Sequence, residues 1–301
     1  MDLFTHPERV LPDRILAAQD SDYPTLLAGT DGAPNVLHLR GTWPLPVAAG
    51  AKIVALVGAR AASGAGLERA HELARGLAER GCLVVSGGAI GIDAAAHRGA
   101  LAARAPTVAV LPSGLDAPYP ARHRPLFADL VQAGGALLSP FAVGTEPLKW
   151  HFPRRNQVIA GMAHAVIVVE AGTRSGSTYT AAAAARLGRM VCACPGSVGT
   201  DQLLALGAKR VTTAEDFFAA LAGDERHIEL AEVSGEAGRV LAALDERVKR
   251  DTDLLADATG LQPHEVASAL FELELDGLAV RVPGGFIASP LARARRRVGT
   301  N

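Results

Sequence analysis

The sequence predicts a doubly wound α/β fold with a mostly parallel sheet, followed by a small C-terminal winged-helix-like domain. From residue 51 onward, short apolar runs that end in glycine alternate with amphipathic helical segments, which is the pattern of β-α-β units. Apolar residues make up 49% of the chain and aromatic residues only 4%, so the core must be built from Ala, Val, Leu and Ile, as in helices packed on a parallel sheet. Beyond residue 235 the pattern changes to three short helices and a hairpin.

Six apolar runs are predicted strands, and they lie at 52–58, 82–88, 107–114, 136–140, 165–172 and 190–196. Helices are predicted between them at 63–81, 92–103, 122–133 and 177–187. We therefore expect six or seven strands joined by right-handed connections. The later pattern predicts helices within 236–246, 251–260 and 263–277 and a hairpin around a turn at 283–285.

The chain divides into four predicted parts. Residues 1–50 contain six prolines and are expected to form an N-terminal arm with little regular structure. Residues 51–230 form the main α/β domain, and residues 231–290 form the winged-helix-like domain. Residues 291–301 form a basic tail, in which a solvated chain is the default expectation.

Charge is distributed unevenly, although the net charge of the chain is only −1. Residues 51–230 carry 18 basic and 14 acidic residues, whereas residues 231–290 carry five basic and 11 acidic residues. An anionic partner is therefore expected to meet the main domain or the tail, and to be repelled by the winged-helix-like domain.

The cysteines and the lack of long apolar runs indicate a cytoplasmic protein. Cys82, Cys192 and Cys194 lie in apolar runs without a C-x-x-C pair, so we expect reduced, packed thiols and no metal site. The sequence shows no signal peptide and no apolar run as long as a membrane helix, so we expect no membrane contact.

Ligands of a doubly wound sheet bind at the carboxyl ends of the strands, so the loops that follow the predicted strands form the candidate site. The first loop contains Gly58, the cation Arg60 and the helix N-cap Ser63. It is not G-x-G-x-x-G, so a dinucleotide site is poorly supported. Its helix N-terminus and cation can hold an anion. Alternatively, Ser63 only caps the helix and Arg60 is a solvated turn residue.

The second loop contains Ser86, Gly87 and Gly88, which allow a ligand to approach the backbone closely. Asp93 and His97 follow four residues apart on one helix face. They are either a general acid/base pair or part of local hydrogen bonding that fixes the loop. We favour the hydrogen bonding, because no nucleophile or metal ligand accompanies them.

The third region, residues 148–161, interleaves bases with aromatic rings. Its notable members are Lys149, Trp150, His151, Phe152, Arg154, Arg155 and Asn156. Cations bind phosphates and an aromatic ring stacks on a base, so this loop is predicted to bind a nucleic-acid strand. The alternative is that Trp150 and Phe152 anchor the loop to the core, and we expect only one of them to be an anchor.

The fourth and fifth loops are rich in glycine. Gly176, Ser177 and Thr178 start an alanine-rich helix beside Arg174 and offer another anion site, and residues 195–208 follow the next strand. Several anion sites on one sheet edge suit a polyanion better than a single small phosphate.

A winged helix usually binds duplex DNA through its recognition helix. The predicted recognition helix at 263–277 contains four acidic residues and no Lys or Arg. Phosphate contacts need cations, so we expect this domain to be an interaction or regulatory module rather than a DNA-binding domain.

Taken together, the motifs resemble those of the DprA/Smf family of DNA-processing proteins, in the family's order and across about residues 50–212. The matching segments are VGAR, SGGAIGIDAAAHRGAL, TVAVLPSGLDAPYP, FPRRNQVIAG, EAGTRSGSTYTAAAAA and CPGSVGT. The C-terminal segment also resembles a domain found in many members.

The resemblance implies an extended Rossmann domain that binds single-stranded DNA, in a homodimeric protein that is not an enzyme and needs no cofactor. It also implies protection of incoming DNA and loading of the RecA recombinase in natural transformation and recombination. The family's DNA pocket carries over to Arg60, Lys149, Phe152, Arg155 and Asn156, with the loops at 86–88 and 176–178 on the same edge. The chain departs from the family at Pro140, at Gln157 and at 88–89.

Two other readings remain open. A phosphoribohydrolase-like enzyme shares glycine-rich loops and a signature similar to PGSVGT at 195–200, but it needs a glutamate shortly after the threonine, where this chain has Asp201. Cleavage of a glycosidic bond also needs positioned carboxylates, and only Asp93 and Glu170 are near. The third reading is a nucleotide-sensing or protein-interaction module.

One apolar group is a predicted partner contact. Phe217, Phe218 and Leu221, on the helix after the sheet, are expected to form part of a dimer or recombinase interface. Packing of this helix on the sheet edge is an equally good expectation.

Overall fold

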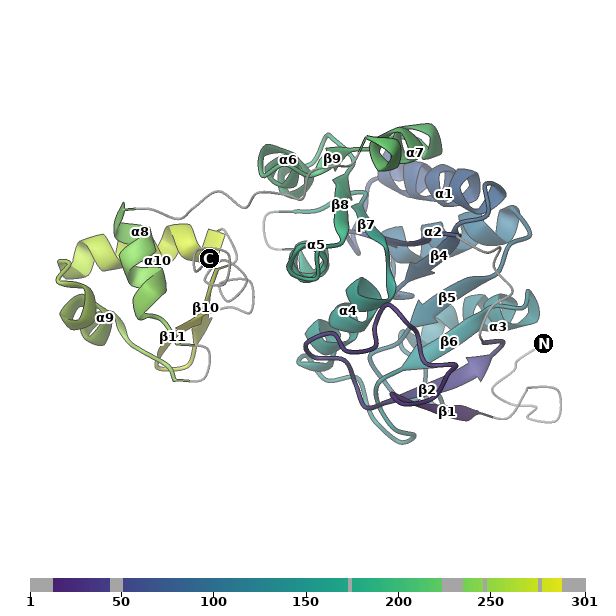
Figure 1. Cartoon of the computed structure of the whole chain (residues 1–301), viewed down its shortest axis with the longest axis horizontal. Coiled ribbons are helices and arrows are strands. Elements are labelled where there is room, and N and C mark those ends of the chain that lie inside the picture. The colour runs from purple at the N-terminus through teal and green to yellow at the C-terminus, as the bar shows by residue number, and fades with distance from the viewer. Residues whose placement is uncertain are drawn as a thin grey trace. The chain divides into compact units, whose positions relative to one another are not determined.

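The structure is a computed structural model of the chain (Figure 1). It describes residues 13–43, 51–172, 175–223, 235–245, 248–275 and 278–288. The basic tail and Arg174, to which the sequence pointed, lie outside these residues.

Within the described residues, a nine-stranded sheet forms the centre of the α/β domain. Its spatial order is β1 (Arg14–Ala17), β2 (Val36–Gly41), β6 (Ala136–Ser139), β5 (Thr107–Val110), β4 (Leu83–Ser86), β3 (Ile53–Val57), β7 (Ala165–Val168), β8 (Met190–Ala193) and β9 (Lys209–Arg210). All strand pairs from β6 to β9 are parallel, whereas the pairs β1–β2 and β2–β6 are antiparallel. The predicted α/β class with a mostly parallel sheet is confirmed.

The N-terminal segment is not the irregular arm that its prolines suggested. β2 pairs with β6, with Leu39 opposite Leu138, and therefore extends the sheet. Between β1 and β2 the chain buries Tyr23, whose hydroxyl donates to the Pro34 carbonyl (2.6 Å). The prolines obscured a strand that alternates buried and half-buried residues with a period of two. These two strands, with the short β9, bring the sheet to nine strands instead of six or seven.

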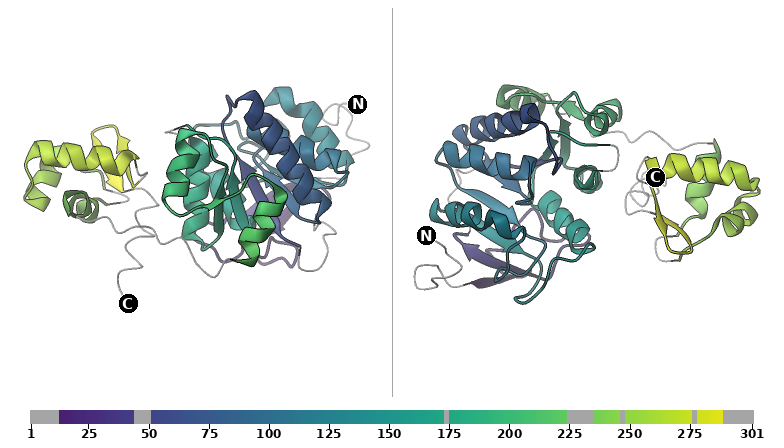
Figure 2. Two further views of the ribbon diagram at one scale, coloured as in Figure 1. Left: turned by 90° about the horizontal axis from the view of Figure 1, so that it is seen from above. Right: turned by 180° about the vertical axis from the view of Figure 1, so that it is seen from behind.

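Helices cover both faces of the sheet, as Figures 1 and 2 show. One face carries α1 (Gly64–Glu79), α2 (Ile92–Ala102), α3 (Arg124–Gln132) and α7 (Ala214–Ala222), and the other carries α4 (His151–Met162), α5 (Gly176–Arg186) and α6 (Val198–Ala205). Successive strand residues face opposite layers, so Leu56 packs in the α1 layer and Val57 in the α4 layer. The sheet is therefore apolar on both faces, as β-α-β connections require.

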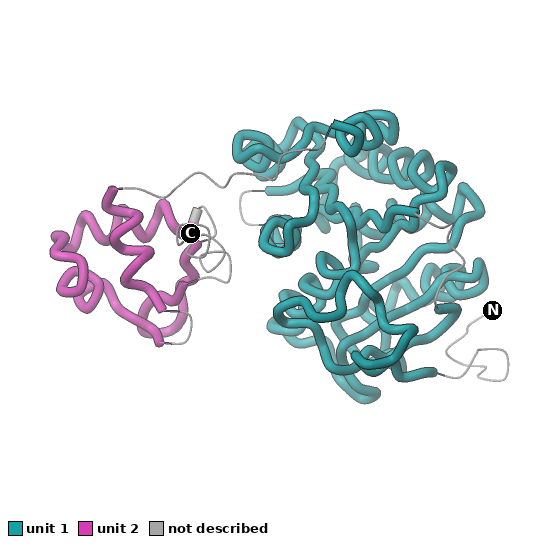
Figure 3. The backbone as a smooth tube through the Cα atoms, viewed as in Figure 1, with its two compact units in different colours: residues 1–228 teal, residues 229–301 magenta. Residues whose placement is uncertain are grey.

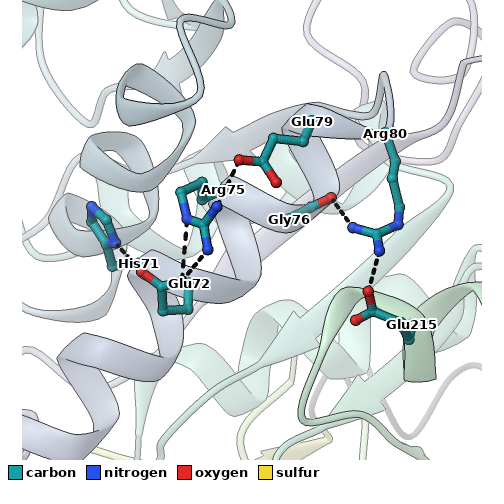
Figure 4. A network of polar contacts seen from close by, with 7 residues as sticks. All are labelled: His71, Glu72, Arg75, Gly76, Glu79, Arg80 and Glu215. Carbon is teal, nitrogen blue, oxygen red and sulfur yellow. Dashed lines mark hydrogen bonds and ion pairs between the residues drawn. The ribbon is translucent and has the colours of Figure 1, made fainter.

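α7 packs against α1, and this corrects one predicted partner contact. An exposed ion pair joins Arg80, which follows the last residue of α1, to Glu215 on α7, and Arg80 also donates to the Gly76 carbonyl (3.0 Å; Figure 4). Exposed pairs of this kind contribute at most about 1 kcal/mol, so apolar contacts hold the helix in place. Phe217 is fully buried in that core and presents no surface to a partner. Phe218 and Leu221 are partly exposed and stay predictions.

The chain forms two compact units, residues 1–228 and residues 229–301 (Figure 3). The second unit contains α8 (Gly235–Ala243), α9 (Thr252–Thr259) and α10 (Pro263–Leu275), followed by the hairpin β10 (Ala279–Val282) and β11 (Gly285–Ala288). Val240, Leu255 and Leu273 are among its fully buried core residues. This arrangement confirms the predicted winged-helix domain.

The three cysteines are buried thiols. Burial raises the pKa of the Cys194 thiol to about 12, so it stays protonated at neutral pH. In the stretches of chain that the structure describes, no helix combines the length and the apolar character that a membrane crossing demands.

Candidate nucleic-acid interface

The strand order reverses between β3 and β7, which are neighbours in the sheet, and this creates a topological switch point at their carboxyl ends. At this point Glu170, two residues beyond β7, reaches the N-terminus of α1. Its carboxylate accepts hydrogen bonds from the Ser63 amide (3.0 Å) and from the Ser63 hydroxyl (2.6 Å). The same hydroxyl accepts from the Gly66 amide (3.0 Å). The anion site predicted for the first loop is therefore filled by the protein's own carboxylate, and Ser63, expected to contact DNA, is committed as a helix cap.

Beside the switch point lies a small pocket, which we call the Arg60–Phe152 pocket. Its lining comprises Arg60, Gly87, Ala89, Ile90, Pro112, Tyr119, Pro120, Phe152 and Arg155. The guanidinium carbon of Arg60 lies 4.6 Å from the centroid of the Phe152 ring, within the range of a cation–π contact. Tyr119 meets the same ring edge to face, at 6.0 Å between centroids. The pocket thus presents a cation and two aromatic rings together.

The segment that carries Phe152 is helical, which corrects the prediction of a basic-aromatic loop. α4 begins at His151, and Pro153 is its third residue, where a backbone N–H has no partner inside the helix. The helical repeat places Phe152 and Arg155 three residues apart on one face, and both line the pocket. Arg154 falls on another face and is exposed.

Arg155 forms the floor of the pocket and is only 4% exposed. Its guanidinium donates to the carbonyls of Val110 (2.8 Å) and Gly87, and its Nε donates to the Asn156 side chain (3.0 Å). Burial lowers its pKa to about 10, so it is still charged at neutral pH. Burial also raises the pKa of the nearby Asp93 carboxyl, although the Arg155 charge opposes that shift. Arg155 therefore adds positive potential from below, rather than extending toward a phosphate as expected.

The second loop, residues 86–88, packs next to Arg155 and is mostly buried. Ser86 is fully buried and its hydroxyl donates to the Leu56 carbonyl (2.6 Å). The prediction that Ser86 contacts DNA is therefore wrong. Gly88 is buried too, at a φ of +67° that favours glycine, and its carbonyl lies 2.9 Å from Nδ1 of His123. Gly87 alone of the three lines the pocket, and Gly58 packs tightly between Ile92 and the Glu170 backbone.

Asp93 and His97 bind different partners, in agreement with the local hydrogen-bond interpretation. Asp93 accepts from the Ala89 amide (3.2 Å). Nδ1 of His97 lies 2.9 Å from the Thr107 hydroxyl, which itself donates to the Val84 carbonyl (2.8 Å). The hydroxyl therefore accepts from His97, which places a proton on Nδ1. Burial lowers the pKa of the ring to about 3, so the imidazole is neutral at neutral pH.

Outside the pocket, Lys149 and Arg154 are exposed and flank Trp150, which is 60% exposed. The anchor of this segment is His151, which is buried against Phe141 with ring centroids 4.0 Å apart. The expectation that Trp150 or Phe152 would be the anchor is wrong, because the imidazole fills that place.

Asn156 connects α4 to the start of α5. Its side-chain amide donates to the Gly176 carbonyl (3.2 Å). Ser177 is buried, and the Thr178 hydroxyl donates to the Ser175 carbonyl (2.6 Å), so both hydroxyl groups serve the helix start. Only the Gly176 backbone is exposed among the three predicted residues.

Sequence reasoning missed Tyr119, the anchoring role of His151 and the role of Glu170. Tyr119 stands between two prolines in a loop that follows β5, which was a usable signal for an aromatic held at the strand ends. No signal near Glu170 in the sequence indicated its contact with Ser63, because 107 residues separate them.

Three carboxylates near the strand ends are engaged with backbone groups. Asp93 and Glu170 hold the loops described above, and Asp201 accepts from the Gly196 amide (3.0 Å). Among the described residues, no group of three or more His, Cys, Asp or Glu side chains is placed to hold a metal ion.

Comparisons with known proteins point to one family. The family profile of DNA recombination-mediator protein A matches residues 14–222, and that of the DprA winged helix domain matches residues 226–285. The chain is 42% identical over 291 residues to the putative DNA processing protein DprA of Mycobacterium tuberculosis, covering 88% of this chain and 74% of that protein.

Solved structures give the same result. The X-ray structure of DNA processing protein A from Streptococcus pneumoniae superposes with a TM-score of 0.63 at 38% identity, over 72% of this chain and 76% of that chain. DNA processing protein A from Helicobacter pylori, whose structure describes a single-stranded DNA binding mode, gives a TM-score of 0.62 at 26% identity, over 72% of this chain and 98% of that chain. The chain therefore belongs to the DprA/Smf family of DNA-processing proteins.

Proposed function

We propose that this chain is a non-enzymatic protein that binds single-stranded DNA at the Arg60–Phe152 pocket. The observation that carries the proposal is the contact of the Arg60 guanidinium with the Phe152 ring, at 4.6 Å, beside the buried charge of Arg155. A base can stack on such a ring while the cation binds its phosphate, and single-stranded DNA offers both groups in every nucleotide. The single-stranded DNA binding described for the Helicobacter pylori relative supports this assignment.

The positions of the carboxylates favour binding over catalysis. A phosphoribohydrolase-like reaction needs a carboxylate directed at the ligand, whereas Glu170 is bound to Ser63 and Asp201 to the Gly196 amide. Asp93 lies below the pocket and already accepts from the Ala89 amide. These engagements support a protein that holds its ligand without transforming it.

The wider role that we propose is protection of incoming DNA and loading of the RecA recombinase, by a cytoplasmic homodimer, in natural transformation and recombination. Membership of the family supports this role. The expected activity is faster assembly of RecA on single-stranded DNA that is already coated with a single-strand-binding protein, measured by the RecA ATPase.

Binding is tested by titrating a fluorescent oligothymidine and following its anisotropy at several salt concentrations. We expect Kd to rise steeply with salt, and Lys149→Ala to flatten the slope of log K against log salt by about 0.7, the value for one lost phosphate contact on a single strand. Arg60→Ala should weaken binding more, because it removes both the charge and the partner of the Phe152 ring.

The matched control is Arg98→Ala, which removes one exposed positive charge from the middle of α2. It should leave the affinity and the salt slope unchanged. Absent or salt-independent binding would refute the proposed function, and hydrolysis of a mononucleotide by the intact chain would establish the enzyme instead.

A further inference from the structure

We propose that Trp150 is a second stacking platform for single-stranded DNA, on which a base outside the Arg60–Phe152 pocket rests. The inference depends on the proposed function, and it adds a binding residue to that site. It starts from the exposure of this large aromatic residue, of which 60% is accessible. Large aromatic side chains usually bury most of their surface, so an exposed indole beside a candidate site indicates a contact surface.

The ring is exposed but held in place. Trp150 packs edge to face against His151, with ring centroids 3.9 Å apart, and against Phe141 at 6.4 Å. His151 is buried, and its Nδ1 accepts a hydrogen bond from the Leu148 amide (3.2 Å), which closes the turn that carries Trp150. An exposed ring with a fixed orientation loses little freedom when a base stacks on it, which favours binding.

Positive charges flank the ring. Lys149 precedes it and is exposed, and the Arg154 guanidinium lies 5.9 Å from the Phe141 ring that supports the indole. Within the described ranges, neither cation forms an ion pair with a carboxylate. Glu146 is the one acidic residue between 140 and 156, against three basic residues. An anionic backbone can therefore pass along this surface while a base meets the ring.

Trp150 is close to the pocket along the chain. It immediately precedes α4, whose second residue, Phe152, lies in the pocket under Arg60. A strand bound at Phe152 thus has a second ring within two residues of the first. A partner protein is the alternative occupant, since Val143 and Leu148, in the segment that precedes Trp150, are also exposed. The flanking cations favour the nucleic acid, and protein binding is an outcome of the test.

The fluorescence emission of Trp150 can report directly on DNA binding at this residue. The other tryptophan, Trp43, is buried, and its Nε1 donates to the Asp22 carbonyl (2.6 Å), so a change in tryptophan emission on binding reports on Trp150. We expect oligothymidine to quench the emission of the full chain, and the quenching to disappear in Trp150→Leu.

Affinity gives an independent readout. Loss of one stacked base corresponds to about 1–3 kcal/mol, so Trp150→Leu should raise Kd about 5- to 150-fold, while Trp150→Phe should retain most of the affinity. In a series of oligothymidines of increasing length, the variant should match the wild type for the shortest oligonucleotide that occupies the pocket. It should then lack the gain in affinity that the wild type shows for longer ones.

Phe271→Leu is the matched control, because Phe271 is similarly exposed (55%) on α10, next to Glu272 and without flanking cations. It should change neither emission nor affinity. Wild-type affinity of Trp150→Leu at every length would overturn the platform, and weaker binding of purified RecA by that variant would then assign the ring to protein contact. Failure of the wild type to bind oligothymidine would refute the proposed function itself, together with the platform.

Discussion

The guanidinium of Arg155 occupies the space that a side chain at position 87 would need. A Cβ built on Gly87 would overlap the Arg155 guanidinium and would also meet the Asp93 carboxylate. Arg155 can donate to the Gly87 carbonyl only because this position has no side chain. The second glycine-rich loop therefore admits a buried cation of the protein itself.

Arg155→Ala is expected to destabilise the fold strongly. The substitution removes hydrogen bonds from a charged donor to two buried carbonyls and leaves Asp93 buried without its nearby positive charge. Losses of this type amount to about 3 kcal/mol or more. Urea unfolding followed by circular dichroism measures the loss, and a change below about 1 kcal/mol would contradict a structural role for this residue.

The contact between positions 87 and 155 predicts strong non-additivity. Gly87→Ala alone should cost about 1–3 kcal/mol, because the guanidinium must move. In the double variant with Arg155→Ala the space is already vacant, so the second substitution should cost little. A double-mutant cycle in urea measures this coupling, and additive losses would show that the two positions act independently.

Glu170→Ala should open the anion site at the start of α1. The wild-type carboxylate satisfies the Ser63 amide and hydroxyl, so its loss should lower the free energy of unfolding by about 1–2 kcal/mol. Inorganic phosphate should then occupy the vacated position, and it should raise the Tm of the variant by more than it raises that of the wild type. Differential scanning fluorimetry at matched ionic strength measures the difference.

Glu170→Gln serves as the control for this prediction. Its amide oxygen can still accept from Ser63, so it should lose less stability than Glu170→Ala and respond less to phosphate. Equal phosphate responses in the wild type and in Glu170→Ala would mean that the carboxylate does not exclude an anion from this helix.

The free energy of unfolding should decrease as the pH is lowered, because His97 is buried in its neutral form. Burial lowers the pKa of this imidazole to about 3 in the folded chain, from 6.5 in the unfolded chain. Between these values the unfolded state binds the proton and the folded state does not, so the contribution of His97 is complete above pH 6.5 and is lost as the pH falls. At pH 5 the loss amounts to about 2 kcal/mol.

His97→Gln isolates this effect, since an amide can still donate to the Thr107 hydroxyl without titrating. The difference in unfolding free energy between wild type and variant should shrink, or reverse in favour of the variant, from pH 7 to pH 5. Parallel pH profiles of the two proteins would contradict the assignment of the titration to His97.

Local patterns predicted the elements that depend on local physics. The apolar runs ending in glycine became β3 to β8, and the helix-helix-helix-hairpin pattern became the winged helix. The same reasoning failed at β2, where prolines nearby outweighed a short alternating strand whose stability comes from pairing with β6, about 100 residues away. It also failed at α4, where bases interleaved with aromatic rings were interpreted as a loop, although Pro153 stands in the first helical turn and is compatible with a helix start.

The candidate site was predicted in position but only partly in detail. Strand-end loops in a doubly wound sheet must converge, so Arg60, Gly87 and Phe152 were expected at one edge, and they line one pocket. Which polar groups face the ligand depends on long-range pairs that leave no local pattern. Ser63 donates to Glu170, and Ser86 donates to the Leu56 carbonyl. The sequence pattern assigned both residues to DNA, because it does not reveal these internal partners.

The surface of α7 gives a prediction about assembly. Phe218 packs edge to face on the buried Phe217, at 5.4 Å between centroids, and is itself only partly covered. If α7 forms the proposed dimer contact, Phe218→Glu places a charge in an apolar interface and should weaken dimerisation about 30-fold or more, because a buried aromatic anchor is worth about 2 kcal/mol or more. Sedimentation velocity over a concentration series measures the dissociation constant. Phe218→Leu keeps the apolar contact and should remain a dimer, whereas an unchanged dimer in Phe218→Glu would place the interface on another surface.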